Sequence, residues 1–79
     1  MSTLTEISEL LQKGRAKEVA ALVQQALDEG STARQVLQEG LMPGMNVVGE
    51  RFKNNEIYVP EVLIAARAMN AGIAVIRPR

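Results

Sequence analysis

The 79 residues contain no histidine, cysteine or tryptophan, and only one phenylalanine and one tyrosine. Histidine is the commonest general base and cysteine a strong nucleophile, so their absence argues against most enzymatic mechanisms. Without cysteine there is neither a disulfide framework nor a thiolate metal site, which fits a reducing, cytoplasmic setting. Carboxylate pairs such as Glu6 with Glu9 remain, but helical surfaces produce such spacings by chance. We therefore predict no catalytic and no metal-binding residues.

An excess of charge of either sign is also missing, because nine basic side chains balance nine acidic ones. This balance gives no electrostatic reason to expect nucleic acid or an anionic membrane as a partner. No 18 apolar residues follow one another without interruption, and no basic stretch precedes an apolar run at the N-terminus. We therefore expect neither a membrane span nor a signal peptide. The composition, 47% hydrophobic and 23% charged, is typical of one small globular domain.

Apolar residues recur at helical spacing along the whole chain, and no stretch alternates as a strand would. The sequence therefore predicts an all-α fold, a compact bundle of four to five short helices with short connections. Thr3 and Glu6 have the spacing of a capping box at the start of the first helix. Gly14 and Gly30 are expected to end the first two helices, and Ser31 or Thr32 to cap the third.

Pro43 predicts a break in the second half of the chain, because proline lacks an N–H and restricts the residue before it. We expect the third helix to end near residues 40–41 and the fourth to start close to Pro43. The fourth helix should stop at residues 53–55, where asparagine tolerates the left-handed conformation. Pro60 and Glu61 suit the first turn of a fifth helix, which Pro78 would close. Its predicted inward stripe consists of Val59, Val62, Leu63, Ala66, Met69, Ile73 and Ile76.

The two aromatic residues, Phe52 and Tyr58, flank the loop between the fourth and fifth helices. Ile57, Tyr58 and Val59 are consecutive apolar residues, and in a bundle this small at least one of them must face away from the core. The pattern alone favours Phe52 as a core residue and Tyr58 as half-exposed, because apolar residues at helical spacing usually belong to a core. The alternative is an apolar patch at one end of the bundle, suited to a flat hydrophobic ligand or partner.

Residues 40–52 read GLMPGMNVVGERF and residues 58–69 read YVPEVLIAARAM. These two segments resemble the helical cap domain of cobalamin-dependent methyl-transfer proteins. That family includes cobalamin-dependent methionine synthase and the small corrinoid proteins that serve methanol, methylamine and methoxyaromatic methyltransferases. The resemblance extends from about Leu4 to Pro78 and is specific after Ser31. The resemblance favours the interpretation of an apolar patch over the interpretation of Phe52 as a core residue.

The resemblance implies cobalamin as the cofactor. In the family, the cap lies over the upper, methyl-bearing face of the corrin, and a separate α/β domain holds the lower face. The family positions against the upper face match Phe52 and Val59 and, more loosely, Tyr58 and Val62. A carboxylate that also approaches the cofactor in the family falls on Gln38 here, next to Glu39. This departure puts the polar contact in question.

The family's D-x-H-x-x-G loop, which supplies the lower cobalt ligand, does not occur in this sequence. The resemblance therefore implies that residues 1–79 form a single cap domain, and that the α/β domain would follow residue 79. Such a cap would shield cobalamin during methyl transfer from a donor to an acceptor, without being an enzyme alone. Its implied partners are the α/β domain and a donor-specific methyltransferase subunit.

A second interpretation stays open, in which the chain is a stand-alone helical interaction or dimerisation module without a cofactor. In either case, the isolated domain is expected to expose an apolar surface. We therefore expect some tendency to form a homodimer, by exchange of a helix across the short connection at residues 42–44.

Overall fold

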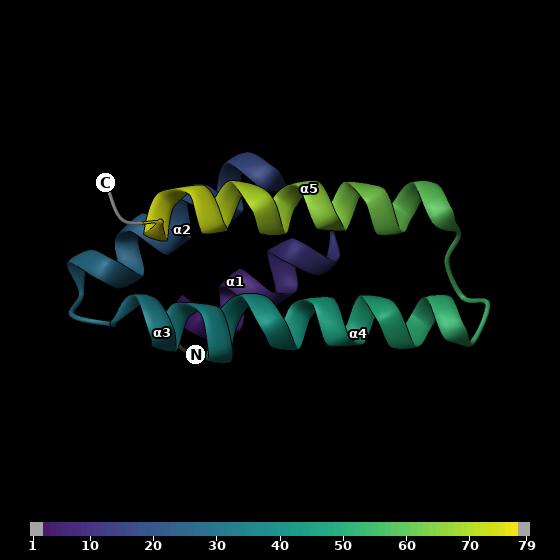
Figure 1. Cartoon of the computed structure of the whole chain (residues 1–79), viewed down its shortest axis with the longest axis horizontal. Helices are drawn as coiled ribbons and strands as arrows, with labels where there is room; N and C mark the ends of the chain where they lie inside the picture. Colours follow the sequence, from purple (N-terminus) through teal and green to yellow (C-terminus); the bar gives the residue numbers. More distant parts are fainter. Residues whose placement is uncertain (1–2, 78–79) are drawn as a thin grey trace.

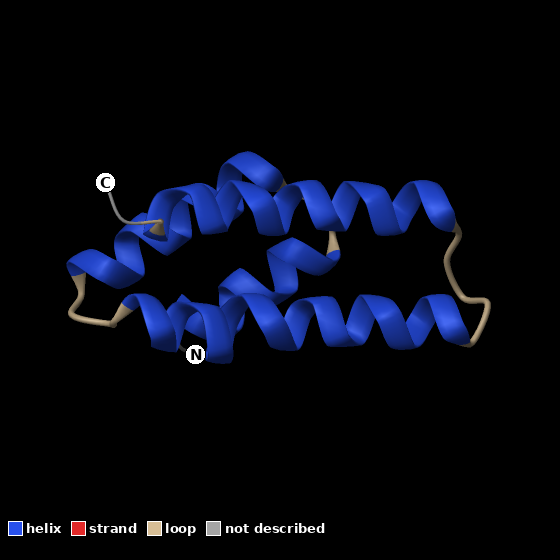
Figure 2. Cartoon of the chain, viewed as in Figure 1, coloured by secondary structure: helices blue, strands red, loops and turns tan. Residues whose placement is uncertain are grey.

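The computed structural model describes residues 3–77, which form helices and no strand within that range (Figures 1 and 2). The elements are α1 (Thr3–Gln12), α2 (Ala16–Asp28), α3 (Ala33–Gln35), the π-helical segment η1 (Val36–Leu41), α4 (Met42–Lys53) and α5 (Val59–Ile76). Because α3, η1 and α4 follow one another without a break, they form one long rod. The predicted all-α bundle is confirmed, with four helical rods.

The rods are arranged in two layers. In Figure 1, α4 and α5 run antiparallel in the nearer layer, and α1 and α2 lie behind them. Helix α2 packs mainly against α5, whereas α1 packs against α2 and against the rod that contains η1 and α4. The shortest dimension of the molecule is 17 Å, which corresponds to two layers of helices. One side of the α4–α5 layer therefore has no helix over it.

The hydrophobic core lies between the two layers and draws on every long helix. Its fully buried side chains are aliphatic: Ile7, Leu11, Val19, Val23, Ala26, Val36, Leu41, Val48, Ala65 and Ala68. Among the described residues, no polar or charged side chain is buried. The core thus contains no polar group that could serve as an internal ligand or general acid.

Most of the predicted helix ends are confirmed. Gly14 and Gly30 have φ values of 75° and 104°, the left-handed conformation expected after a helix. Thr32 is the cap of α3, since its hydroxyl accepts a hydrogen bond from the Gln35 N–H at 3.1 Å. The predicted cap at Thr3 is wrong, because Thr3 is itself helical and its hydroxyl donates to Glu29 at 2.8 Å. Pro78, expected to close the last helix, lies outside the described residues.

The predicted boundary near Pro43 coincides with the change from η1 to α4 at residues 41–42, but the predicted interruption of the helix there is wrong. The helix continues through this point, and Met42, the residue before the proline, keeps helical angles of φ −63° and ψ −44°. The preceding π-turn makes this continuity feasible: the Met42 N–H donates to the Leu37 carbonyl, five residues back. This wider turn rearranges the carbonyls in front of the proline ring, which lacks its own donor. Residues 42–44 are therefore not a loop, and they offer no hinge for the helix exchange expected from the sequence.

The predicted inward face of α5 is correct only in part: Val62, Met69, Ile73 and Ile76 are partly buried against the core, but the stripe is wrong at Val59 and Leu63. The fully buried residues of this helix are small ones, Ala65, Ala68 and Gly72, whereas Val59 and Leu63 are exposed. Small residues allow α5 to approach its neighbours closely. A Cβ atom at Gly72 would lie 2.9 Å from Leu41 Cδ2 and 3.2 Å from Val19 Cγ1. The larger residues of α5 are thereby turned toward its flanks and its outer side.

Helix α5 is the most apolar element, with 18 residues and a mean hydropathy of 1.5. By length and composition alone it could cross a membrane, although the sequence lacks an uninterrupted apolar run. Helices of folded bundles can be equally long and apolar, so these two properties are weak evidence for a membrane span. In addition, α5 carries the charged residues Glu61 and Arg67. Three of its 18 residues, or 17%, are fully buried, and its exposed large hydrophobic side chains are Val59, Leu63 and Ile64.

Candidate functional site: an exposed apolar face on α4 and α5

Large hydrophobic side chains are exposed on only one part of the described structure. They are Met42, Val47, Phe52, Tyr58, Val59, Leu63 and Ile64, with exposed fractions between 37% and 71%. All of them belong to α4, α5 or the loop between these helices. A 79-residue domain that leaves so much apolar surface uncovered in one region is expected to bind something there.

Helical periodicity divides these residues between two flanks of the α4–α5 pair. One flank faces the C-terminal end of α1, where Val48, Arg51, Glu61 and Ile64 line a hollow of about 320 Å³ together with Ile57 and residues 12–14. On the opposite flank, α4 presents residues spaced at i, i+3, i+7 and i+10, and α5 presents residues spaced at i, i+3, i+4 and i+7. We call this second surface the α4–α5 face; it consists of Met42, Met45, Gly49, Phe52, Val59, Val62, Leu63 and Ala66.

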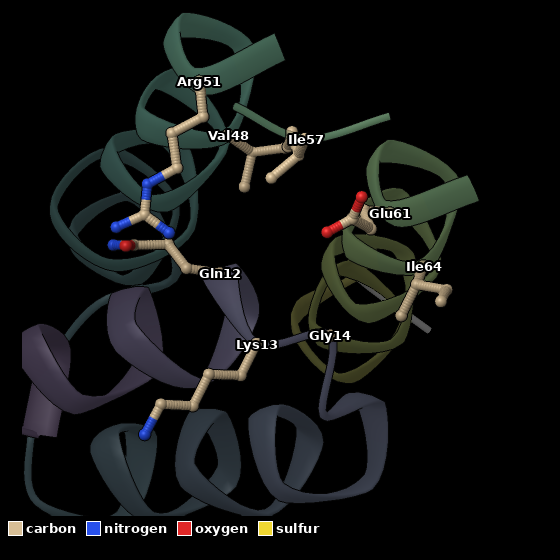
Figure 3. Close-up of a pocket in the computed structure, with 8 residues that line it drawn as sticks. All are labelled: Gln12, Lys13, Gly14, Val48, Arg51, Ile57, Glu61 and Ile64. Carbon is tan, nitrogen blue, oxygen red and sulfur yellow. The ribbon is translucent and has the colours of Figure 1, made fainter. Parts of the chain in front are cut away.

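The hollow on the first flank has a different chemical character. Figure 3 shows the Glu61 carboxylate directed into it and the Arg51 side chain extending toward Gln12. The Glu61 carboxylate is already engaged, since it accepts a hydrogen bond from the Tyr58 N–H at 2.8 Å. None of the residues that the sequence predicts as cofactor contacts lines this hollow. The α4–α5 face is therefore the better candidate for an apolar ligand.

The structure brings four of the five predicted site residues to one end of the molecule. Phe52 lies in the last turn of α4 with 44% of its surface exposed, and Val59 opens α5 with 54% exposed. Tyr58 is the most exposed hydrophobic residue, at 71%, and Val62 is partly buried against the core. The interpretation of Phe52 as a core residue is wrong. As expected, part of the run of residues 57–59 faces away from the core.

Gln38 does not join this group. It is exposed on η1, and it precedes Phe52 by 14 residues along the same rod. At the helical rise per residue, this separation corresponds to about 20 Å along the axis. Its assignment as a cofactor contact remains a prediction, and the structure does not place it beside the aromatic end of the face.

Backbone hydrogen bonds fix the turn that joins the end of α4, near Phe52, to the start of α5 at Val59. At the end of α4, the Asn55 N–H donates to the Phe52 carbonyl at 3.1 Å and the Glu56 N–H donates to the Arg51 carbonyl at 2.8 Å. These are the two bonds of a Schellman motif, and they require the left-handed conformation of Asn55, with φ 64°. Ile57 then packs against the core and anchors the loop.

Five members of the face were not predicted as site residues: Met42, Met45, Gly49, Leu63 and Ala66. Leu63, 62% exposed, was assigned to the inward stripe of α5, although its spacing of four residues from Val59 places both on the same side. Gly49 has no Cβ, and open space surrounds the position where a Cβ would lie. The signal for Gly49 was its place inside a helix, where glycine is disfavoured.

The α4–α5 face can cover a ligand, but it carries no group that could react with one. Its side chains are aliphatic or aromatic and carry no ionisable group. Residues 3–77 contain no group of three or more acidic side chains that could hold a metal ion. Such a surface can exclude water and press against a flat apolar group, but it cannot transfer protons.

Known proteins that are similar to this chain include corrinoid proteins. A family model described as B12 binding domain matches residues 3–77. A corrinoid protein of Desulfitobacterium hafniense strain Y51 is 37% identical over 78 residues, which cover 99% of this chain and 36% of that protein. Trimethylamine corrinoid protein 1 of Methanosarcina mazei is 46% identical over 63 residues, which cover 80% of this chain and 28% of that protein. The chain thus spans well under half the length of these relatives.

A solved structure shows the same fold. The monomethylamine corrinoid protein of Methanosarcina barkeri matches with a TM-score of 0.91 and 24% identity, over 94% of this chain and 35% of that one. The close superposition identifies the helical arrangement as that of a segment of a corrinoid protein. Because the family model covers nearly its entire length, the chain belongs to the B12 binding domain family, whose cofactor is cobalamin.

Proposed function

We propose that this chain is the helical cap of a corrinoid methyl-carrier protein, and that its α4–α5 face covers the methyl-bearing side of cobalamin. The observation that carries the proposal is that four of the seven exposed large hydrophobic side chains lie on that face: Met42, Phe52, Val59 and Leu63. Family membership makes cobalamin the ligand to be considered first. In such systems cobalamin supplies the cobalt that carries the methyl group, and the helices supply its surroundings.

The residues present fit such a group. The face is apolar, and the open space at Gly49 would allow a planar molecule to lie against the backbone of α4. Phe52, Val59 and Leu63 would exclude water from the covered side of the ring, with Tyr58 at the margin. A cover of this kind protects a reactive centre from solvent, and it must move aside when a reaction partner needs access.

The remaining partners follow from the same proposal. One face of a corrin offers limited burial, so the chain by itself should bind cobalamin weakly, and an α/β domain would hold the other side. We propose that this domain follows residue 79, with a methyl donor-specific methyltransferase as the second partner. The chain would then act as a domain of a methyltransferase system in the cytoplasm and would not catalyse methyl transfer alone.

A chimera tests the proposal. The matching segment of the trimethylamine corrinoid protein of Methanosarcina mazei would be replaced by this chain, and the protein loaded with methylcobalamin. Phe52→Ala should speed photolysis of the cobalt–methyl bond, because the ring becomes more accessible. The matched control is Val47→Ala, which removes an exposed apolar side chain from the other flank of α4 and should leave photolysis unchanged. Equal photolysis rates in the unmodified chimera and in its Phe52→Ala and Val47→Ala variants would contradict the capping role.

The same surface supports a second candidate function, a helical module that associates with itself or with another helix. The extent of exposed apolar surface on α4 and α5 favours it. The two functions differ in what covers the face. Protection of methylcobalamin in the chimera supports the cap, whereas a tight dimer that neither protects nor contacts cobalamin supports the interaction module.

A further inference from the structure

Five of the six glycines have a structural reason that is visible within the chain. Gly14 and Gly30 have positive φ values at helix ends. Gly40, Gly44 and Gly72 lie where a Cβ atom would come within 3.3 Å of a neighbouring helix. The sixth, Gly49, has neither property: its φ is ordinary, and apart from its own stretch of helix no described atom lies within 4 Å of the position that a Cβ would take.

Gly49 lowers the stability of the helix that contains it. It lies in the interior of α4, four residues before the last, where glycine destabilises a helix by about 1 kcal/mol relative to alanine. Alanine at this position would meet no steric conflict in the described structure. The chain therefore carries a destabilising residue that its own fold does not require.

The position of Gly49 on the α4–α5 face suggests why glycine is needed there. It lies on the α4–α5 face, one turn from Met45 on one side and from Phe52 on the other. Met45 is partly buried and Phe52 is 44% exposed, so the missing side chain leaves a gap between two large residues. The bottom of this gap is the α4 backbone itself. A gap of this kind admits a flat group to direct contact with the helix.

We infer that Gly49 is a ligand-positioning residue, and that its missing side chain lets the corrin ring rest on the α4 backbone between Met45 and Phe52. This inference rests on the proposed function, and it adds a contact that the predicted site residues did not include. A methyl group at this position would hold the ring away from the helix and loosen the contacts of Phe52 and Val59 with it.

The test compares the stability of the chain with its affinity for methylcobalamin. In Gly49→Ala, the melting temperature should rise by about 4 °C because the helix gains a better former. Binding of methylcobalamin, followed by amide chemical shifts of the α4–α5 face, should become about tenfold weaker. Val47→Ala serves as the matched control and should leave binding unchanged, since Val47 lies on the other flank of α4.

Each outcome is decisive. A stabilised Gly49→Ala variant that binds as well as the unmodified chain overturns the role of Gly49, while the cap survives if Phe52→Ala still weakens binding. A loss of stability in Gly49→Ala would also overturn it, because the glycine would then be needed by the fold. If neither Gly49→Ala nor Phe52→Ala changes photolysis of the cobalt–methyl bond in the chimera, both the inference and the proposed cap are wrong.

Discussion

The Glu61 carboxylate accepts a hydrogen bond from the backbone N–H of Tyr58, with Oε1 and N 2.8 Å apart. The bond spans three residues and closes the first turn of α5 onto the end of the loop. It thereby fixes the backbone of Tyr58 and Val59 at the start of α5. A carboxylate that faces the hollow on one flank thus supports the apolar face on the other.

We expect Glu61→Ala to lower the free energy of unfolding by about 1 kcal/mol, because the Tyr58 N–H loses its side-chain acceptor. Glu61→Gln is the control, since its amide oxygen can accept the same bond. Urea denaturation of the three proteins measures the difference. If the glutamine variant loses as much as the alanine variant, the hydrogen bond is not the stabilising interaction.

Substitution of two of the three interhelical glycines, Gly44 and Gly72, should show how rigid each contact is. Gly44→Ala would place a Cβ 2.9 Å from the Ser8 carbonyl oxygen, a backbone atom that cannot move without shifting α1. Gly72→Ala would press on Leu41 Cδ2, the end of a side chain. We expect Gly44→Ala to cost about 2–3 kcal/mol and Gly72→Ala about 1 kcal/mol in denaturant unfolding. The reverse order would contradict the assignment.

The left-handed residue in the α4–α5 loop should be sensitive to substitution. Asn55→Ala places a less suitable side chain at φ 64°, and we expect a loss of about 1 kcal/mol in unfolding free energy. Asn54→Ala, with φ −87°, is the control and should be nearly neutral. Equal effects of the two substitutions in denaturant unfolding would show that the turn conformation is not the cause.

The isolated chain should self-associate weakly through the α4–α5 face. Leu63→Ser removes one of its most exposed apolar side chains and should shift the dissociation constant of a dimer upward by about tenfold. Ile64→Ser, on the other flank of α5, is the control. Sedimentation equilibrium measures both. A monomer at every attainable concentration of the unmodified chain would contradict this expectation.

The helix ends could be predicted because they depend on local backbone preferences. Gly14, Gly30 and Asn55 adopt the left-handed conformation that the sequence indicated, and Thr32 caps its helix. The continuity at Pro43 could not be predicted in this way. It depends on an i to i−5 hydrogen bond at Met42, a rare arrangement for which the sequence pattern has no signal.

The candidate site was predicted in part. Tyr58 and Val59 were recognised as unusual because, together with Ile57, they form a run of three apolar residues that cannot all face a small core. Phe52 was recognised because it and Tyr58 are the two aromatic residues that flank the loop. Leu63 was misplaced because the inward face of α5 was expected to carry its largest residues. Instead, α5 buries its small residues Ala65, Ala68 and Gly72 most completely. Which residues a helix buries depends on how closely the neighbouring helices approach it, and the sequence of α5 alone does not indicate this.

The π-turn in η1 has a consequence for the angular phase of the long rod. Val36, Gly40, Gly44 and Val48 are all buried, and each is four residues from the next. In an uninterrupted α-helix, twelve residues would rotate Val48 by about 120° away from Val36. In the wider π-turn, the chain rotates about the helix axis by fewer degrees per residue. This smaller rotation brings Val36 and Val48 toward the same side of the rod. Removing one residue from η1 would therefore turn α4 about its own axis, and Phe52 would leave the face that it forms with Val59.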